Sequence, residues 1–102
     1  MHPSFLDNDH AARFEWKEEG FLAFADYRRG PGRLILTHFE TDPAARGRGL
    51  AGKLMSAIWD DAQARGLKIE PRCPYAVDWF DKHPEKASLR VERQEAQEQS
   101  SA

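Results

Sequence analysis

The chain has 102 residues, 40% hydrophobic and 31% charged, with a formal net charge of −2. These values predict one globular domain with a modest core, and the slight negative charge argues against a nucleic-acid partner, which usually requires a basic face. No apolar run reaches the length of a membrane span, and the N-terminus lacks the regions of a signal peptide. The single cysteine, Cys73, excludes an internal disulfide. Together these features predict a cytoplasmic protein with no membrane partner.

The N-terminal part of the chain has the alternating pattern of antiparallel strands. Residues 1–9 read as a loose lead-in. Beyond them, alternation of apolar and polar side chains predicts three strands, over residues 12–18, 21–28 and 33–41. Glu19-Gly20 and the run Arg29–Gly32 are turn signals between these strands. The pattern therefore predicts a three-stranded antiparallel meander.

The second half of the chain alternates helix and strand. Asp42-Pro43 ends the third strand, and the sequence then predicts a loop, a helix over 49–65, a strand over 67–72 and a helix over 75–82. A strand–helix–strand order is typical of a crossover between parallel neighbours. We therefore expect an α+β fold with a mixed sheet, one domain over residues 1–91 and a disordered tail over 92–102, where Glu, Gln, Ser and Ala dominate.

One loop stands out because glycines and arginines interleave where the first helix begins. It reads Arg46-Gly47-Arg48-Gly49-Leu50-Ala51. Free backbone N–H groups and the positive end of the helix dipole converge there, which suits a phosphate-bearing ligand. The spacing is neither a Walker A motif nor the dinucleotide fingerprint. An ordinary strand-to-helix turn, in which glycine relieves strain, explains the short motif about equally well on its own.

The wider segment resembles a known family. From Thr37 to Ala51 the chain resembles motif A of the GNAT acetyltransferase superfamily, with Arg46, Gly49 and Ala51 at the motif's positions. Further stretches resemble the small single-domain GNAT-like subfamily: Glu40-Thr41-Asp42-Pro43, Gly66-Leu67-Lys68-Ile69, Cys73-Pro74-Tyr75 and His83-Pro84. The resemblance covers most of the chain, from about Phe14 to Leu89.

This resemblance implies acetyl-CoA as ligand or co-substrate. In such folds the loop amides hold the CoA pyrophosphate, and here those amides belong to Arg46, Gly47, Arg48, Gly49, Leu50 and Ala51. The strand before the loop, at Phe39 and Thr41, would offer backbone groups to pantetheine. That strand and the next parallel one separate in the superfamily to admit the thioester, whose carbonyl a backbone amide would polarise.

Four titratable side chains are candidate catalytic residues. Glu40, with His38 on the same strand face, is a candidate base or proton relay, although two polar residues on a solvated face explain the pair as well. Cys73 is either a buried small hydrophobe or an acyl acceptor, and Tyr75 either packs or serves the departing thiolate. Phe80 stands nearest to the place where many GNAT enzymes have a tyrosine acid.

These features favour an acetyl-CoA-dependent N-acetyltransferase acting on an unidentified amine, carried by a small molecule or a protein. The alternative is a non-enzymatic acetyl-CoA-binding sensor, self-acetylated on Cys73. A nucleotide or nucleic-acid binder fits the arginines but not the net charge. No histidine has a partner at metal-ligand spacing, so no metal is expected. The chain is expected to be a monomer or weak homodimer.

Overall fold

The computed structural model describes residues 3–92 and contains a five-stranded sheet with two α-helices. The strands are β1 (Phe5–Asn8), β2 (Arg13–Glu18), β3 (Phe21–Gly30), β4 (Arg33–Thr41) and β5 (Lys68–Pro71), and they neighbour one another in chain order. The helices are α1 (Leu50–Arg65) and α2 (Pro74–Lys82), with 3₁₀ turns at Asp9–Ala11, Pro43–Ala45 and Pro84–Leu89. Strands β1 to β4 are antiparallel and β5 is parallel to β4, which confirms the α+β fold with a mixed sheet.

The lead-in is where the sequence prediction was wrong. Residues 5–8 form β1, which pairs with β2 from Phe5 opposite Trp16 to Asn8 opposite Arg13. Phe5 is buried and stacks on Phe14 with ring centroids 5.6 Å apart. A stretch of four residues is too short to show an alternating pattern. This strand forms because the Phe5 ring is buried against β2, which is a tertiary contact. The predicted tail, apart from Glu92, lies outside the described residues.

A register shift in β4 decides which of its side chains face α1. Asp26 pairs with His38 but Tyr27 pairs with Leu36, so Thr37 is the extra residue of a β-bulge. Before the bulge, Leu34 and Leu36 are buried toward α1. Beyond it the phase of the alternation moves by one residue, so Phe39 packs on the core while His38 and Glu40 stay exposed on the other face.

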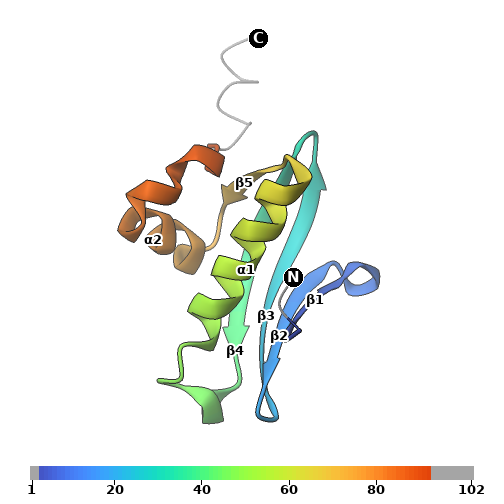
Figure 1. Ribbon diagram of the computed structural model, residues 1–102, viewed down its shortest axis with the longest axis vertical. Coiled ribbons are helices and arrows are strands. Elements are labelled where there is room, and N and C mark those ends of the chain that lie inside the picture. The colour runs from blue at the N-terminus through green and yellow to red at the C-terminus, as the bar shows by residue number, and fades with distance from the viewer. Residues whose placement is uncertain (1–2, 93–102) are drawn as a thin grey trace.

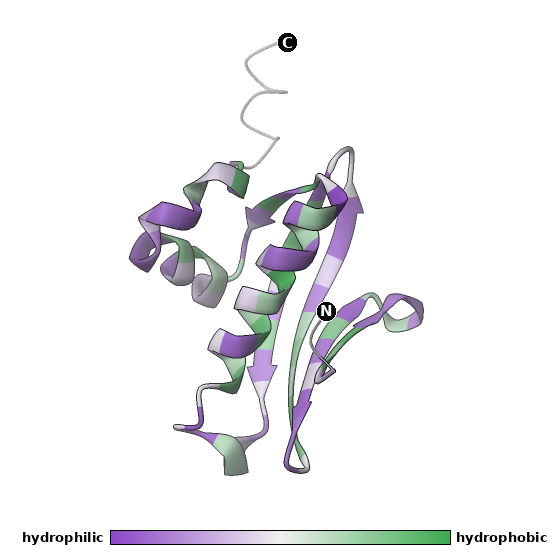
Figure 2. Ribbon diagram, in the orientation of Figure 1, coloured by the Kyte–Doolittle hydropathy of each residue, from purple (hydrophilic) through white to green (hydrophobic). Residues whose placement is uncertain are grey.

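Helix α1 lies across one face of the sheet and supplies much of the core (Figure 1). Its hydrophobic side turns toward the strands and its polar side turns outward (Figure 2). The buried α1 residues are Leu50, Leu54, Met55, Ile58, Trp59 and Ala62. Ala23 and Ala25 of β3 are fully buried beneath the helix, and their small side chains let it approach the sheet closely. Gly66 ends α1 in a left-handed conformation, which glycine adopts readily at a helix C-terminus.

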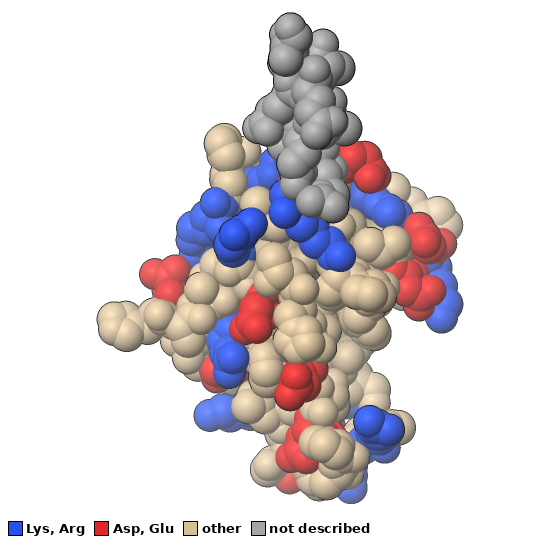
Figure 3. All heavy atoms as spheres, turned by 180° about the vertical axis from the view of Figure 1, so that it is seen from behind, with Lys and Arg blue, Asp and Glu red and all other residues tan. Residues whose placement is uncertain are grey.

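The opposite face of β2, β3 and β4 carries no helix of the described chain (Figure 1), and Figure 3 shows the molecule from that side. We call it the far face; alternation places Phe24, Asp26, His38 and Glu40 on it. At the β5 end of the sheet, Glu70 is 1% exposed and is held by Arg33, 2.9 Å away, and by Arg72. These ion pairs neutralise the buried Glu70 carboxylate at this edge of the sheet, where no helix of the described chain covers the far face.

Strands β4 and β5 pair over only part of their length. Their parallel register runs from Arg33 opposite Lys68 to Leu36 opposite Pro71, and one further bond joins the Arg72 N–H to the Leu36 carbonyl. The chain then turns away into α2, whereas β4 continues to Thr41. The β5-side edge of residues 37–41 is therefore left open within the described structure, which is the separation that the family resemblance implied.

Within residues 3–92, no helix is both long and apolar enough to cross a membrane.

Candidate active site

The start of α1 is an uncapped helix terminus. Gly49 occupies the N-cap position with φ 74°, and no side chain of the described residues caps the helix there. Gly47 is also left-handed, with φ 84°. Both glycines adopt conformations that L side chains rarely reach, and the turn they form leaves the first helical N–H groups facing outward. Anions commonly bind at helix N-termini of this kind, which is the role that the sequence predicts for this loop.

The two arginines of the loop are held differently. Arg48 is turned back toward the β2–β3 hairpin, where its Nη1 lies 3.0 Å from Glu19 Oε1 and its guanidinium lies over the Phe21 ring. Arg46 is exposed, and its guanidinium makes no ion pair within residues 3–92. Leu50 is 1% exposed, so it offers a ligand only its backbone N–H while its side chain anchors the helix in the core. Within the described residues, Arg46 is therefore the arginine of this loop that has no ion-pair partner.

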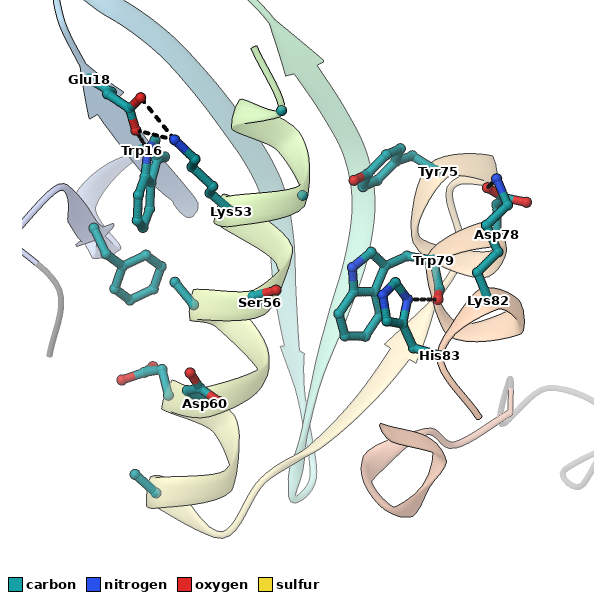
Figure 4. A pocket seen from close by; sticks show the side chains of 16 residues that line it. Trp16, Glu18, Lys53, Ser56, Asp60, Tyr75, Asp78, Trp79, Lys82 and His83 are labelled. Carbon is teal, nitrogen blue, oxygen red and sulfur yellow. Dashed lines mark hydrogen bonds and ion pairs between the residues drawn. The ribbon is translucent and has the colours of Figure 1, made fainter. Parts of the chain in front are cut away.

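A groove runs over the outer side of α1, starting at this terminus, with a cavity volume of about 990 Å³. We call it the α1 groove; its polar floor comes from successive turns of the helix, at Gly49, Gly52, Lys53, Ser56 and Asp60 (Figure 4). Its size lies at the upper end of the range for small-molecule and cofactor sites, about 300–1000 Å³. The groove can therefore hold an extended ligand that begins at the α1 N-terminus.

The two walls of the α1 groove are aromatic. One wall carries Trp16, and the other carries Tyr75 and Trp79 of α2, with His83 stacked on Trp79 at 4.3 Å (Figure 4). Lys53 Nζ lies 2.9 Å from both carboxylate oxygens of Glu18, so its charge is already paired. These walls offer flat apolar surface to a ligand, and the α1 N-terminus offers N–H donors.

Tyr75 connects the groove with the open edge of β4. Its ring lies 4.9 Å from the ring of Phe39, and its hydroxyl lies near Gly52 of α1. Burial and then the charge of Asp78 raise the pKa of Tyr75 above its ordinary value, so it stays protonated at neutral pH. A phenol that keeps its proton is a hydrogen-bond donor at the point where β4 and β5 separate.

His38 and Glu40 lie on the other side of β4 from Phe39. His38 Nε2 and Glu40 Oε1 are 2.9 Å apart, and both side chains are more than half exposed. The structure thus forms the imidazole–carboxylate pair that the sequence predicted, but on the far face and not in the α1 groove. Thr41 also lines a small pocket on that face.

Cys73 is placed as a structural residue. Its side chain is 6% exposed, it caps α2, and its Sγ accepts a hydrogen bond from the Ala76 N–H at 3.4 Å. It is not among the residues that line the α1 groove. Phe80 is also buried and packs edge-on against Trp79 at 5.2 Å. Of the candidate residues on α2, Tyr75 alone reaches the groove.

Several groove residues were not predicted from the sequence. Gly52, Ser56 and Asp60 follow Gly49 at intervals of three or four residues, which is the spacing of one helix face. Trp79 and His83 have the same four-residue spacing on α2. These intervals were a usable signal, whereas Trp16 and Glu18 reach the groove only through the tertiary packing of β2 beside α1. The described residues contain no cluster of three or more candidate metal ligands.

Comparison with known proteins decides the family. The model of the GCN5-related N-acetyltransferases matches residues 13–89, which is most of the chain. The chain belongs to this family. Its fold is similar to that of a GCN5-like protein from Staphylococcus aureus, itself a proposed N-acetyltransferase, solved by NMR in solution. That similarity has a TM-score of 0.60 at 22% identity and covers 80% of this chain and 83% of the other.

Membership of this acetyltransferase family confirms the GNAT resemblance and supports acetyl transfer as the general activity. The matched segment begins at β2 and ends with the 3₁₀ turn after α2, so it includes the glycine–arginine loop, α1 and α2. The solved structure, at its low identity, supports the fold alone.

Proposed function

We propose that this protein is an acetyl-CoA-dependent N-acetyltransferase whose two substrates approach β4 from opposite faces of the sheet. The proposal rests on how the side chains of β4 alternate between the two faces of the sheet after its bulge. Phe39 lies on the α1 side against Tyr75, and His38 and Glu40 lie on the far face. The β4 edge between these faces is unpaired by β5 in the described structure. A thioester at this edge would be accessible from both sides.

Acetyl-CoA would bind on the α1 side. Its diphosphate would accept hydrogen bonds from the N–H groups of Gly47, Gly49, Leu50 and Ala51, where the helix dipole adds positive potential, while the Arg48 N–H already donates to the Ala45 carbonyl. Arg46 would supply a positive charge. Part of the ligand would occupy the α1 groove, and its thioester arm would pass Tyr75 to reach the open edge of β4 at Phe39. The acidic side chains further along the groove, such as Asp60, keep the phosphates at the α1 N-terminus.

The acceptor amine would approach on the far face. A neutral amine nitrogen attacks the thioester carbonyl carbon, the new C–N bond forms as the C–S bond breaks, and CoA leaves as a thiolate. The proton lost by nitrogen passes to Glu40, with His38 hydrogen-bonded to the same carboxylate. The Tyr75 hydroxyl donates a hydrogen bond to the thiolate, which then takes a proton from solvent. Because its pKa is raised, Tyr75 stabilises this anion by donation and keeps its own proton.

The proposal is tested by thiol release from acetyl-CoA in the presence of candidate amines. Glu40→Gln should lower kcat/KM by about 10²–10⁴-fold, as expected for loss of a general base. Glu40 is exposed, so this variant should unfold at the temperature of the wild type. The matched control is Glu85→Gln, an exposed carboxylate on the 3₁₀ turn after α2, which should keep full activity.

The alternative, an acetyl-CoA-binding protein without turnover, is distinguished by the same experiments. Binding of acetyl-CoA with no thiol release for any amine would favour it. Intact mass after incubation with acetyl-CoA then tests self-acetylation on Cys73. The burial of this thiol and its role in capping α2 argue against such an adduct.

A further inference from the structure

A small pocket on the far face lies directly beside Glu40. It has a cavity volume of about 230 Å³ and is lined by Leu22, Phe24, Glu40, Thr41, Asp42 and Pro43. We call it the far-face pocket. Phe24 pairs with Glu40 across β3 and β4, so the two side chains project to the same side of the sheet. The Asp42 N–H donates to the Leu22 carbonyl at 2.8 Å, which fixes the end of β4 against β3.

The walls of this pocket combine apolar surface with uncompensated negative charge. Leu22 and Phe24 are both partly buried, although they lie on the face without a helix. Within residues 3–92, neither Glu40 nor Asp42 forms an ion pair with a lysine or arginine; Glu40 contacts His38, and Asp42 caps the following turn.

The other acidic residue on this strand pair is already neutralised. Arg13 Nε lies 3.3 Å from Asp26 Oδ1, and the Arg13 guanidinium lies 3.8 Å from the centre of the Phe24 ring. Arg13 is thereby held at the Asp26 end of Phe24. Glu40 and Asp42, at the other end of Phe24, have no lysine or arginine partner within residues 3–92. On the neighbouring β2, Glu15 accepts a hydrogen bond from Asn8 Nδ2 and Lys17 lies opposite Leu22.

We propose that the far-face pocket binds the acceptor of the acetyl group, and that this acceptor is a primary ammonium on an unbranched alkyl chain, such as a lysine side chain or a diamine. The methylene groups would pack along Leu22 and Phe24, and the ammonium would lie between the carboxylates of Glu40 and Asp42. The volume is below the range of about 300–1000 Å³ that encloses drug-sized ligands, which favours a single chain over a ring system.

This assignment rests on the proposed acetyltransferase function, because it names the amine that attacks the thioester. The bound ammonium would first release one proton to solvent, and Glu40 would take the second as the C–N bond forms. The assignment adds a separate role for Asp42, which would select the charged acceptor and take no proton. The same carboxylate would also disfavour neutral or anionic acceptors, since their approach leaves Asp42 without a counter-charge.

The test is a binding titration followed by amide NMR of the isotope-labelled chain, which needs no turnover. Three probes separate the contributions: n-pentylammonium has both chain and charge, n-pentanol has the chain alone, and ammonium has the charge alone. We expect n-pentylammonium to shift the amides of Leu22, Phe24 and Glu40, and to bind more tightly than either other probe. Equal affinity for n-pentanol, or shifts confined to other residues, would overturn the proposal.

Asp42→Asn tests the charge without disturbing the loop. The retained side-chain oxygen still accepts the Ala44 N–H, which lies 3.0 Å from Asp42 Oδ1. Loss of one partly exposed ion contact should weaken n-pentylammonium binding by about two- to fivefold. Asp26→Asn is the matched control on the same face, and it should leave this affinity unchanged because Arg13 already occupies that carboxylate. If both substitutions weaken n-pentylammonium binding equally, the ligand is attracted only by the general surface charge, and the proposal is contradicted.

Steady-state kinetics then distinguish the transferase function from the assignment of the far-face pocket. With acetyl-CoA and n-pentylamine, Asp42→Asn should raise KM for the amine and leave kcat within about twofold. If n-pentylammonium occupies the far-face pocket but no amine releases thiol, the transferase function fails while the pocket assignment stands. If amines are acetylated with no preference for the charged alkyl chain, the transferase stands and the pocket assignment fails.

Discussion

Two glycines at the ends of α1 provide a matched pair for testing the ligand loop. Gly49 and Gly66 have nearly the same left-handed backbone, with φ, ψ of 74°, 21° and 71°, 28°. A Cβ built at either position has no atom within 4 Å, so alanine would add backbone strain and no steric clash. Gly49 lines the α1 groove and Gly66 does not. The two substitutions should therefore cost the same stability and differ in ligand binding.

The expected cost follows from this geometry. A left-handed alanine is unfavourable by about 1–2 kcal/mol, and the reduced entropy of the unfolded chain returns about 0.4–1 kcal/mol. A net loss of about 1 kcal/mol lowers the melting temperature of a domain of this size by about 4–8 °C. Gly49→Ala and Gly66→Ala should show this same loss in thermal unfolding without ligand.

Acetyl-CoA should then separate the two variants. At a hundredfold excess over Kd, a ligand stabilises the folded state by about 2.7 kcal/mol. The wild type and Gly66→Ala should gain this amount, whereas Gly49→Ala should gain clearly less, because its methyl group would stand beside the N–H groups proposed to bind the diphosphate. Equal gains in both variants would refute the assignment of the phosphate site to this loop.

Further predictions concern charge, burial and pH. Glu70→Ala should lose about 3–5 kcal/mol in urea unfolding, because it leaves two arginines near the sheet without their buried carboxylate; a loss below 1 kcal/mol would show that the cluster is not stabilising. Burial and then the hydrogen bond to Asp7 raise the pKa of Tyr27 above its ordinary 10.0, so the folded state favours the protonated phenol. Stability should therefore be lost as the pH rises above about 10, and Tyr27→Phe should reduce that dependence and leave the contribution of Tyr75; a dependence unchanged in the variant would contradict the linkage. Arg46→Gln should weaken acetyl-CoA binding several-fold and reduce its salt dependence, whereas Arg28→Gln, an exposed arginine on β3 that does not line the α1 groove, should do neither. For an alkylamine acceptor, kcat/KM should rise about tenfold per pH unit from pH 7 to 9, because only the neutral amine attacks; a flat profile would exclude attack by the free amine.

The main strands and helices could be predicted from the sequence because the patterns that indicate them are local. β4 and α1 lie where alternation, Asp42-Pro43 and the glycines predicted them, within a residue. β1 was missed because its stability comes from the packing of Phe5 on Phe14, a contact between strands that four residues cannot encode by pattern.

The site was predictable in its parts and not in their arrangement. The loop and the His38–Glu40 pair each follow from short-range spacing. Their placement on opposite faces depends on the bulge at Thr37, which changes the phase of alternation within one strand. The burial of Cys73 depends on α2 folding back over the sheet, so its sequence position next to the fourth predicted strand could not show it.

The central claim is that acetyl-CoA binds at the start of α1. The most direct measurement is an amide NMR titration of the labelled chain with acetyl-CoA. The account predicts the largest shifts at the amides of Gly47, Arg48, Gly49, Leu50 and Ala51, with smaller ones at Phe39 and Tyr75. Saturation with these loop amides unmoved, or shifts centred elsewhere, would contradict it.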